Sequence, residues 1–320
     1  MTEAPEAAQP APEAKSGTSL PKRITVFGGS GFIGRRLVQR LVEGGATVRI
    51  ADRQPDRARQ RLPRDVADGL ETAVADIRDQ VTVDAAVSGA DAVINLVGIL
   101  YEKGPQTFTA IHTEGAGRVA DAAARASVGR LVQMSALGAD PDAAAAYARS
   151  KAAGEAAVQR VVAAATIVRP SIVFGREDDF FNKFAGMAAV SPALPLIGGG
   201  RTRFQPVFVD DVAEAFARIL TDPATAGKTY ELGGPQVYTF RELLELLLKQ
   251  MRIRRLLMPL PFPIAEAEAF FLEKLPKPPL TRDQLALLRS DNVVSGRLPT
   301  LQDLGITPTP LETVLPTYIR

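Results

Sequence analysis

The feature that most constrains the fold lies near the start of the chain, where an apolar, β-branched run leads into three spaced glycines. Residues 24–34 read Ile-Thr-Val-Phe-Gly-Gly-Ser-Gly-Phe-Ile-Gly. Apolar residues then recur at helical spacing, at Ile33, Leu37, Val38, Leu41 and Val42. The pattern predicts a strand, a tight turn and a helix.

Glycine in such a turn leaves the backbone N–H groups open to a phosphate, and the helix N-terminus adds partial positive charge at the same place. We therefore interpret the turn as a dinucleotide cradle. The alternative is a glycine-rich turn that only lets strand and helix pack closely. The residues expected to line the cradle are Gly28, Ser30, Gly31, Phe32, Ile33 and Gly34.

The rest of the chain continues as strands alternating with helices. Strands are expected at 47–51, 72–75, 92–97, 130–135 and 166–168, with a helix over about 108–126. This alternation predicts an α/β fold, a doubly wound parallel sheet that binds ligands beyond the carboxyl ends of its strands. We expect a dinucleotide-binding domain over 21–175, to which 207–232 return, and a smaller C-terminal α/β lobe over 176–320.

Composition excludes several classes of site. The net charge of +2 gives no reason to expect nucleic acid as a partner, and the absence of cysteine excludes disulfides and thiolate ligands. A single histidine, His112, rules out a multi-histidine metal site, and we expect it to serve packing or hydrogen bonding. No apolar run is long enough to span a membrane. Residues 1–20, rich in Ala, Pro and Glu, resemble no targeting signal and are expected to be a disordered tail. We therefore expect a protein that is cytosolic or bound to another structure from the cytosolic side.

The choice of nucleotide depends on two residues that favour opposite answers. Asp52 ends the second strand, where a carboxylate accepts from a ribose 2′-hydroxyl and favours NAD(H), whereas the following Arg53 suits the 2′-phosphate of NADP(H). Arg35, Arg36 and Arg57 add positive charge nearby, so we favour NADPH. Further cofactor contacts are expected after the third and fourth strands, at Asp76 and Ile77 for the adenine and at Leu96, Val97 and Gly98.

Tyr147 and Lys151 stand four residues apart on a predicted helix and therefore project from one face. Beside a nicotinamide, the ammonium lowers the pKa of the phenol and holds the ribose hydroxyls. Ser135, at the end of the fifth strand, is placed to bind a substrate carbonyl. The alternative for Tyr147 and Lys151 is an ordinary pair on a helix surface.

The turn Gly-Gly-Ser-Gly-Phe-Ile-Gly, the Tyr147/Lys151 pair and Arg169-Pro170 before Val173-Phe174-Gly175 resemble the extended and atypical short-chain dehydrogenases/reductases. The resemblance adds Pro170 and Ile172 to the cofactor contacts. Later segments, among them 95–100, 177–182, 204–209, 230–235 and 291–295, are similar to one branch, the nucleotide-binding accessory subunits of respiratory complex I in their bacterial form.

That resemblance implies a protein that holds NADPH permanently, contacts the core subunits of complex I and stabilises the peripheral arm near the quinone site without turnover. It also implies a peripheral location on the cytoplasmic side of the bacterial inner membrane. Ala136 after Ser135 and His112 at a position that often carries asparagine agree with lost catalysis, so Ser135, Tyr147 and Lys151 would be vestigial or cofactor-holding. Two alternatives remain open. One is an active NADP-dependent reductase, epimerase or dehydratase on a small or lipid-linked substrate, and the other is a redox-sensing regulator.

The C-terminal lobe carries one further candidate surface. Arg252, Arg254 and Arg255 precede an apolar, proline-broken run over 256–264. Such a sequence suits contact with a membrane surface or a protein partner. The alternative is the core of the smaller lobe, with the arginine heads reaching to solvent.

Overall fold

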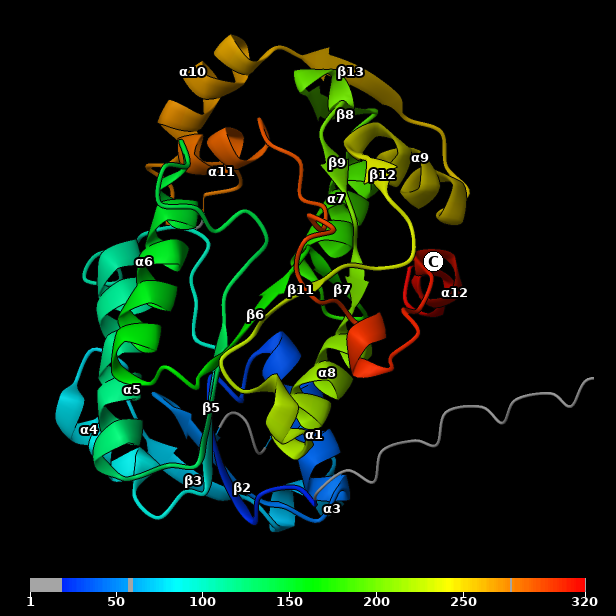
Figure 1. The fold of residues 1–320 in the computed structure, drawn as a ribbon. Helices are drawn as coiled ribbons and strands as arrows, with labels where there is room; N and C mark the ends of the chain where they lie inside the picture. Colours follow the sequence, from blue (N-terminus) through cyan, green and yellow to red (C-terminus); the bar gives the residue numbers. More distant parts are fainter. Residues whose placement is uncertain (1–18, 57–59, 277, 320) are drawn as a thin grey trace, which may run out of the picture.

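The computed structural model describes residues 19–56, 60–276 and 278–319, which form a seven-stranded parallel sheet with helices on both faces and a second lobe beyond it (Figure 1). The strands lie in the order β11-β6-β5-β4-β1-β2-β3. The first part of the chain comprises β1 (Arg23–Phe27), α1 (Phe32–Glu43), β2 (Thr47–Asp52), α3 (Arg64–Asp68), β3 (Glu71–Val74), α4 (Gln80–Val87), β4 (Ala92–Asn95), a π-helical segment (Thr109–Gly115), α5 (Ala116–Arg125), β5 (Arg130–Met134), α6 (Ala146–Val161) and β6 (Thr166–Pro170). The doubly wound fold expected from the sequence is confirmed.

β1 is an inner strand of the sheet, and later strands are added on both of its sides. β2 and β3 follow on one side of β1, whereas β4, β5, β6 and β11 lie on the other. The strand order therefore reverses between β1 and β4. In open α/β sheets, ligands bind beyond the carboxyl ends of the strands at such a point, and we call this region the crevice. This crevice is where the glycine-rich turn lies, directly after β1.

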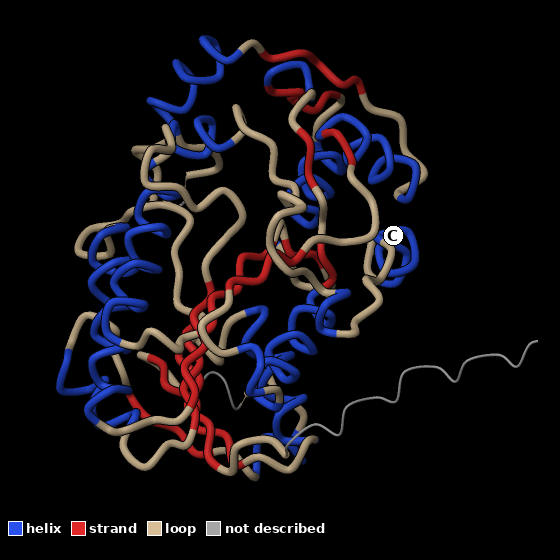
Figure 2. Tube along the Cα trace, viewed as in Figure 1, coloured by secondary structure: helices blue, strands red, loops and turns tan. Residues whose placement is uncertain are grey.

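Helices cover both faces of the sheet (Figure 2), and each face has its own apolar core. On one face, side chains of α1 and α8 (Val209–Thr221) pack together with the strands, as Leu37, Leu41 and Phe216 illustrate. On the other face, α4, α5 and α6 contribute residues such as Val83 and Val119. The apolar runs of the central strands are needed because both faces of those strands are buried.

The second lobe follows β6 and has a third core, rich in phenylalanine and leucine. Its strands pair only two at a time, β7 with β10, β9 with β12 and β8 with β13. The elements after β6 are β7 (Val173–Phe174), α7 (Asp179–Val190), β8 (Ala193–Ile197), β9 (Arg203–Phe204), β10 (Val207–Phe208), α8, β11 (Thr229–Leu232), β12 (Tyr238–Thr239), α9 (Phe240–Gln250), β13 (Leu256–Leu260), α10 (Phe262–Leu272), α11 (Arg282–Leu287) and α12 (Leu311–Val314), with single 3₁₀ turns at Gly198–Gly200, Pro223–Thr225, Gln302–Leu304 and Leu315–Thr317.

The chain returns to the sheet twice after β6. α8 packs on α1 and β11 pairs with β6, within the segment 207–232 expected to return. The chain also returns a second time, which the sequence did not predict. Leu301, Leu304 and Ile306 pack in the core under α1 and α8. The proposed domain limits leave out this last segment.

Local differences from the expected elements have local causes. β4 ends at Asn95 rather than 97, since the Asn95 side chain accepts the N–H of Val97 and turns the backbone away. The helix expected over 108–126 begins as a π-helical segment before α5. Of the tail expected over 1–20, residues 1–18 lie outside the described part of the chain, while Leu20 packs beside the core under α1. Within the described ranges, none of the helices has the length and apolar character needed to cross a bilayer.

Candidate functional site

The glycine-rich turn is built so closely that side chains cannot replace its glycines. Gly28 has a φ of +75°, in the left-handed region that favours glycine, and a Cβ there would lie 3.4 Å from the backbone of Leu96 and Val97. A Cβ at Gly34 would lie 2.3 Å from the carbonyl oxygen of Gly28. The first turn of α1 therefore lies directly on the turn that precedes it.

The N-terminus of α1 is free to receive an anion. The N-cap, Gly31, provides no side-chain hydrogen bond, and the first turn of α1 contains no acidic residue. The N–H groups of Phe32, Ile33 and Gly34 have no partner within the helix. Unsatisfied N–H groups, a positive helix end and a turn that a Cβ would fill together suit the pyrophosphate of a dinucleotide. The residues expected to line the cradle are thus brought together.

The end of β2 carries a hydrogen-bonded carboxylate beside a free cation. Ser30 donates its hydroxyl to one oxygen of Asp52, and the N–H of Gln54 donates to the other at 3.1 Å. Arg53 is exposed and forms no ion pair within the described part of the chain. Arg36, expected to add charge here, instead pairs with Asp210, and Arg57 lies outside the described residues.

The residues after β3 have partners of their own. Asp76 forms a two-pronged ion pair with Arg78, which together with the nearby charge of Arg53 lowers the pKa of Asp76. Ile77 is buried against Gly115 rather than lying open to the crevice. An adenine contact for these two residues stays a prediction.

The backbone that follows β4 lies beside Lys151 on α6. Leu96 and Val97 back directly onto Gly28, and a Cβ at Gly98 would lie 3.3 Å from the ammonium nitrogen of Lys151. The Lys151 ammonium is buried and donates to the carbonyl oxygen of Met134, the last residue of β5, at 3.4 Å. The sheet ends and the helix face expected to carry chemistry therefore do meet.

His112 joins the loop after β4 to α6 through its two ring nitrogens. The N–H of Ile99 donates to Nε2 at 3.0 Å, so the proton of the neutral ring must lie on Nδ1, which is 2.9 Å from the hydroxyl of Ser150. That hydroxyl in turn donates to the carbonyl of Tyr147. Burial, with a smaller effect of Lys151, lowers the pKa of His112 to about 2. His112 is thus a neutral hydrogen-bonding residue, as expected, and its lone pair is already used.

The Tyr147 phenol is poorly placed to ionise. Burial, followed by the charge of Asp283, raises its pKa to about 12, and its hydroxyl has no hydrogen-bond partner among the described residues. Its ring packs edge-on against Phe108 and His112. Burial likewise lowers the pKa of Lys151 to about 8, opposed by Glu155. Lys151 lies 5.8 Å from the Tyr147 ring centre. The expected lowering of the phenol pKa by this ammonium beside a nicotinamide stays a prediction.

Ser135 is the third member of the expected catalytic set. Its hydroxyl is buried, 3 % exposed, and finds no hydrogen-bond partner within the described ranges. Buried polar side chains are normally hydrogen-bonded. Ser135 therefore keeps a polar group available at the end of β5.

Residues of the second lobe contact the elements around the crevice, and most of them were not predicted from the sequence. The carboxylate of Asp283, on α11, accepts the N–H groups of Ala146 (2.5 Å) and Tyr147 (3.1 Å) and so caps α6 across the crevice. Asn292 binds Ser171 and the N–H of Ile172 directly after β6, beside the expected contact Pro170. No local signal marks such residues, because their partners are more than 100 positions away.

Arg35 makes a third link across the crevice. Its side chain is buried on α1, pairs with Glu177 and lies near the carbonyl of Ser30. The sequence had suggested Arg35 as a source of positive charge near the nucleotide, but its partner comes from the segment before α7. The glycine turn is thereby tied to the second lobe.

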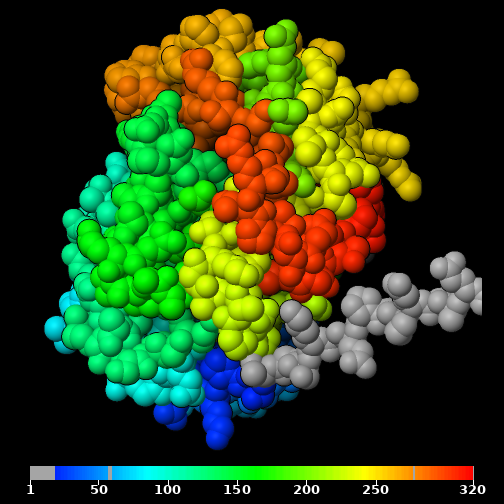
Figure 3. Space-filling model, viewed as in Figure 1, coloured from blue at the N-terminus to red at the C-terminus, as the bar shows by residue number. Residues whose placement is uncertain are grey.

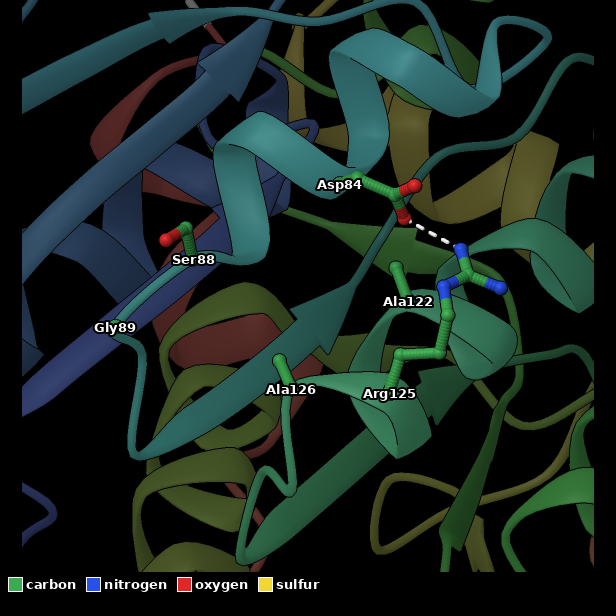
Figure 4. A pocket seen from close by; sticks show the side chains of 6 residues that line it. All are labelled: Asp84, Ser88, Gly89, Ala122, Arg125 and Ala126. Carbon is green, nitrogen blue, oxygen red and sulfur yellow. Dashed lines mark hydrogen bonds and ion pairs between the residues drawn. The ribbon is translucent and has the colours of Figure 1, made fainter.

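A separate hollow between α4 and α5 does not belong to this site (Figure 4). It lies at the C-terminal ends of both helices, and thus at the sheet edge opposite the carboxyl ends of the strands. Its lining consists of Asp84, Ser88, Gly89, Ala122, Arg125 and Ala126, with Arg125 donating to Asp84. In the described part of the chain, no cluster of three or more His, Asp or Glu side chains is arranged to hold a metal ion.

Comparison with known proteins gives consistent matches. The model of the NAD dependent epimerase/dehydratase family matches residues 24–233. The NADH dehydrogenase (ubiquinone) 1 alpha subcomplex subunit 9 of Arabidopsis thaliana is 38 % identical over 304 residues, 90 % of this chain and 75 % of that protein. The NADH-ubiquinone oxidoreductase 40 kDa subunit of Neurospora crassa is 32 % identical over 297 residues, 92 % of this chain and 78 % of that protein.

Among solved structures, the dTDP-glucose 4,6-dehydratase DesIV of Streptomyces venezuelae, determined with NAD bound, superposes with a TM-score of 0.70. The superposition covers 93 % of this chain and 96 % of that one, at 21 % identity. At this identity the likeness concerns the fold alone.

Proposed function

Because the chain belongs to the NAD-dependent epimerase/dehydratase family, and within it to the family of complex I alpha subcomplex subunit 9, we propose that it is an accessory subunit of respiratory complex I that holds a nicotinamide dinucleotide without turnover. The family expected from the sequence is confirmed. The proposed role is to stabilise the peripheral arm near the quinone site through contacts with core subunits.

One observation supports this function above all: an intact cradle for the dinucleotide lies beside a tyrosine whose acid–base chemistry is suppressed. The N-terminus of α1 is open for a pyrophosphate, whereas the pKa of Tyr147 is raised to about 12 and its hydroxyl is unpartnered in the described residues. A general acid–base group works best with a pKa near the working pH. Binding without turnover fits this combination.

The bound nucleotide is proposed to be NADPH. A nicotinamide supplies hydride chemistry when it is bound, but here the chain's own residues are proposed only to hold it. Both oxygens of the Asp52 carboxylate already accept hydrogen bonds, while the exposed guanidinium of Arg53 is available to a 2′-phosphate. The residues proposed to contact the nucleotide are Gly28, Ser30, Gly31, Phe32, Ile33, Gly34, Asp52, Arg53, Asp76, Ile77, Leu96, Val97, Gly98, Tyr147, Lys151, Pro170 and Ile172.

The proposed location is peripheral, on the face of the membrane that carries the peripheral arm, which is the cytoplasmic side in a bacterium. The relatives are named as mitochondrial subunits of NADH dehydrogenase, which supports assembly with such a complex. We propose that the C-terminal lobe faces the membrane.

A working NADP-dependent reductase, epimerase or dehydratase is the second candidate, because Ser135 keeps an unpartnered, buried hydroxyl at the end of β5. Such a hydroxyl would bind a substrate carbonyl. This function requires Tyr147 to ionise far more readily than burial and Asp283 allow.

One experiment separates the two functions. The tagged protein is purified from its native membranes, its companions are identified, and the nucleotide released on denaturation is analysed. We expect complex I subunits, about one equivalent of NADPH per chain and no exchange of hydride with added metabolites. A protein found alone in the cytosol that oxidises NADPH with a metabolite would contradict the accessory-subunit function.

A further inference from the structure

Strand β13 and helix α10 of the second lobe lie at the end of the molecule farthest from β2 and β3 (Figures 1 and 3). Several large apolar side chains of this region are exposed. They lie on β13, on α10 and just after it, and Leu256 and Phe271 keep 69 % and 67 % of their surface exposed. We call this group the apolar apex; its members are Leu256, Met258, Ile264, Phe270, Phe271 and Leu275. Clustered exposure of this kind marks interaction surfaces, unlike single exposed apolar residues.

Helix α10 presents apolar side chains on two opposite faces. Ala265 and Ala269, four residues apart, are fully buried and attach the helix to the lobe. Ile264 and Phe271 are seven residues apart, share the other face and are exposed. The helix thus has an inner face that packs and an outer apolar face that is mostly exposed, with the ammonium of Lys274 5.7 Å from the ring centre of Phe271.

The strand before α10 continues the same surface. Along β13 and the residue pair before it, Arg254, Leu256 and Met258 are exposed, whereas Leu257 and Leu260 pack on the third core. Side chains of a strand alternate between faces, so these three residues point to the same side. An arginine is thereby aligned with two exposed apolar residues.

The charges around the apolar apex are mainly positive. Arg252, Arg254 and Lys274 form no ion pair within the described ranges, and the ammonium of Lys274 lies 4.9 Å from the ring centre of Phe270. By contrast, the carboxylates of Glu266 and Glu273 are each paired with an arginine. Only Glu268 remains on α10 as an acidic group without such a pair in this part of the chain.

We infer that the apolar apex inserts into the headgroup region of an anionic bilayer, with Phe270 and Phe271 among the acyl chains and the flanking arginines and Lys274 at the phosphates. Apolar insertion supplies most of the affinity, and attraction to anionic lipid adds to it. This inference rests on the proposed function, which places the protein at a membrane. It adds which residues contact the membrane and that the lipid is anionic.

The absence of tryptophan from the whole sequence permits a direct test with the purified full-length protein. Phe271→Trp adds one tryptophan to the apex, and Val81→Trp adds one at an exposed site on α4 in the sheet domain. With phosphatidylcholine vesicles containing phosphatidylglycerol, we expect a blue shift of the emission of F271W and none for V81W. A shift of neither, or of both equally, would overturn the inference.

Co-sedimentation with the same vesicles tests the energetic contributions. The double substitution F270S/F271S should weaken binding at least tenfold, since each buried phenylalanine contributes strongly to transfer from water. R252Q/R254Q should weaken it by about fivefold per arginine and reduce the dependence on salt, as should omission of phosphatidylglycerol. Unchanged binding of F270S/F271S, or equal binding to neutral vesicles, would contradict the inference.

The same preparations distinguish this inference from the proposed function. Nucleotide content and co-purification with complex I are measured for the wild type and for F270S/F271S. If the wild type retains both but binds no vesicles, the apex inference alone fails. If the wild type binds vesicles but brings down no complex I subunits, the proposed function alone fails.

Discussion

The two ends of the crevice, the glycine cradle after β1 and the Tyr147/Lys151 pair on α6, are built by opposite physical means. At the cradle, polar backbone groups remain unsatisfied and the glycines leave no room for side chains. At the other end, the neutral forms of the titratable groups are favoured: Lys151 is buried and its pKa is lowered, while Tyr147 is partly buried and its pKa is raised. The cradle thus has free N–H groups that suit a ligand, whereas the pKa of Tyr147 lies well above neutral pH.

This difference indicates that binding and chemistry are separable on this fold. The cradle depends on backbone geometry, which the glycines alone determine. Acid–base chemistry depends on local electrostatics, which burial and a single carboxylate, Asp283, shift away from neutral pH. A family member can therefore lose turnover while its nucleotide site remains intact.

Removing the cradle should give the largest effect. In Gly34→Ala the new Cβ would meet the carbonyl of Gly28 at 2.3 Å, so α1 must move away from the turn. We expect nucleotide affinity, measured by calorimetry, to fall at least a hundredfold, with a loss of stability of about 1–3 kcal/mol from overpacking. Gly186→Ala on α7 is the control, since a Cβ there meets nothing within 4 Å. Unchanged binding by G34A would show that the cradle is not where the nucleotide lies.

At the Tyr147/Lys151 end of the crevice, we expect an effect on the pH dependence of the free energy of unfolding. Below about pH 8, Lys151 is protonated in the folded and unfolded states, and folding bears the full cost of burying its charge. Between pH 8 and its ordinary value of 10.5 the unfolded chain binds more protons, so stability rises by up to about 1.4 kcal/mol per pH unit. Tyr147 opposes this trend only above about pH 10, where the unfolded tyrosine ionises first.

Denaturant unfolding of nucleotide-free protein checks this behaviour against Lys151→Met. We expect K151M to be the more stable protein at pH 7, and the wild type to gain on it by up to about 2 to 3 kcal/mol between pH 8 and pH 10. Parallel stability curves would mean that Lys151 is not buried as a charge, and the contrast between the two crevice ends would weaken.

The cradle could be predicted from sequence because all of its residues lie within one strand–turn–helix unit. The parallel sheet could also be predicted, because strands and helices alternate along the chain. The limits of β4 were missed because a side chain, Asn95, ends that strand. Local patterns thus predict local geometry, and fail where a single polar contact redirects the backbone.

The residues of the second lobe that contact the site could not be predicted from local sequence patterns. Asp283 caps α6 from 137 positions away, and Glu177 pairs with Arg35 across 142 positions. Burial and Asp283, both products of the tertiary fold, raise the pKa of Tyr147, and the lowering by Lys151 beside a nicotinamide stays a prediction. Spacing along a helix places two side chains on one face, but it does not determine the burial and the charges around them, which set their pKa values.

Nucleotide choice tests the cradle end more finely. In Arg53→Ala the affinity for NADPH should fall about tenfold, the loss of a charge-assisted contact, while that for NADH should not change. Asp52→Asn should favour NADPH further, because it removes a negative charge from beside the 2′-phosphate. Arg36→Ala is the matched control, as Arg36 is engaged by Asp210. Equal losses for both nucleotides in R53A would mean that Arg53 does not contact the 2′-position.

The smallest effect concerns Asp283, through which the second lobe contacts the Tyr147/Lys151 end of the crevice. Asp283→Ala removes the only carboxylate on the N-terminus of α6 in the described chain and should lower stability by about 1 kcal/mol, as loss of a helix cap does. The same change removes a negative charge from beside Tyr147, so the pKa of the phenol should fall from about 12. It should remain above 10, because burial is the larger cause of the rise. Phenolate absorbance, with Tyr147→Phe subtracted, measures that pKa, and Asp283→Asn, which keeps an acceptor for the α6 N–H groups, separates the charge from the cap. If D283N leaves the phenol pKa unchanged, burial alone suppresses Tyr147, and the second lobe contributes to the stability of α6 without adjusting its chemistry.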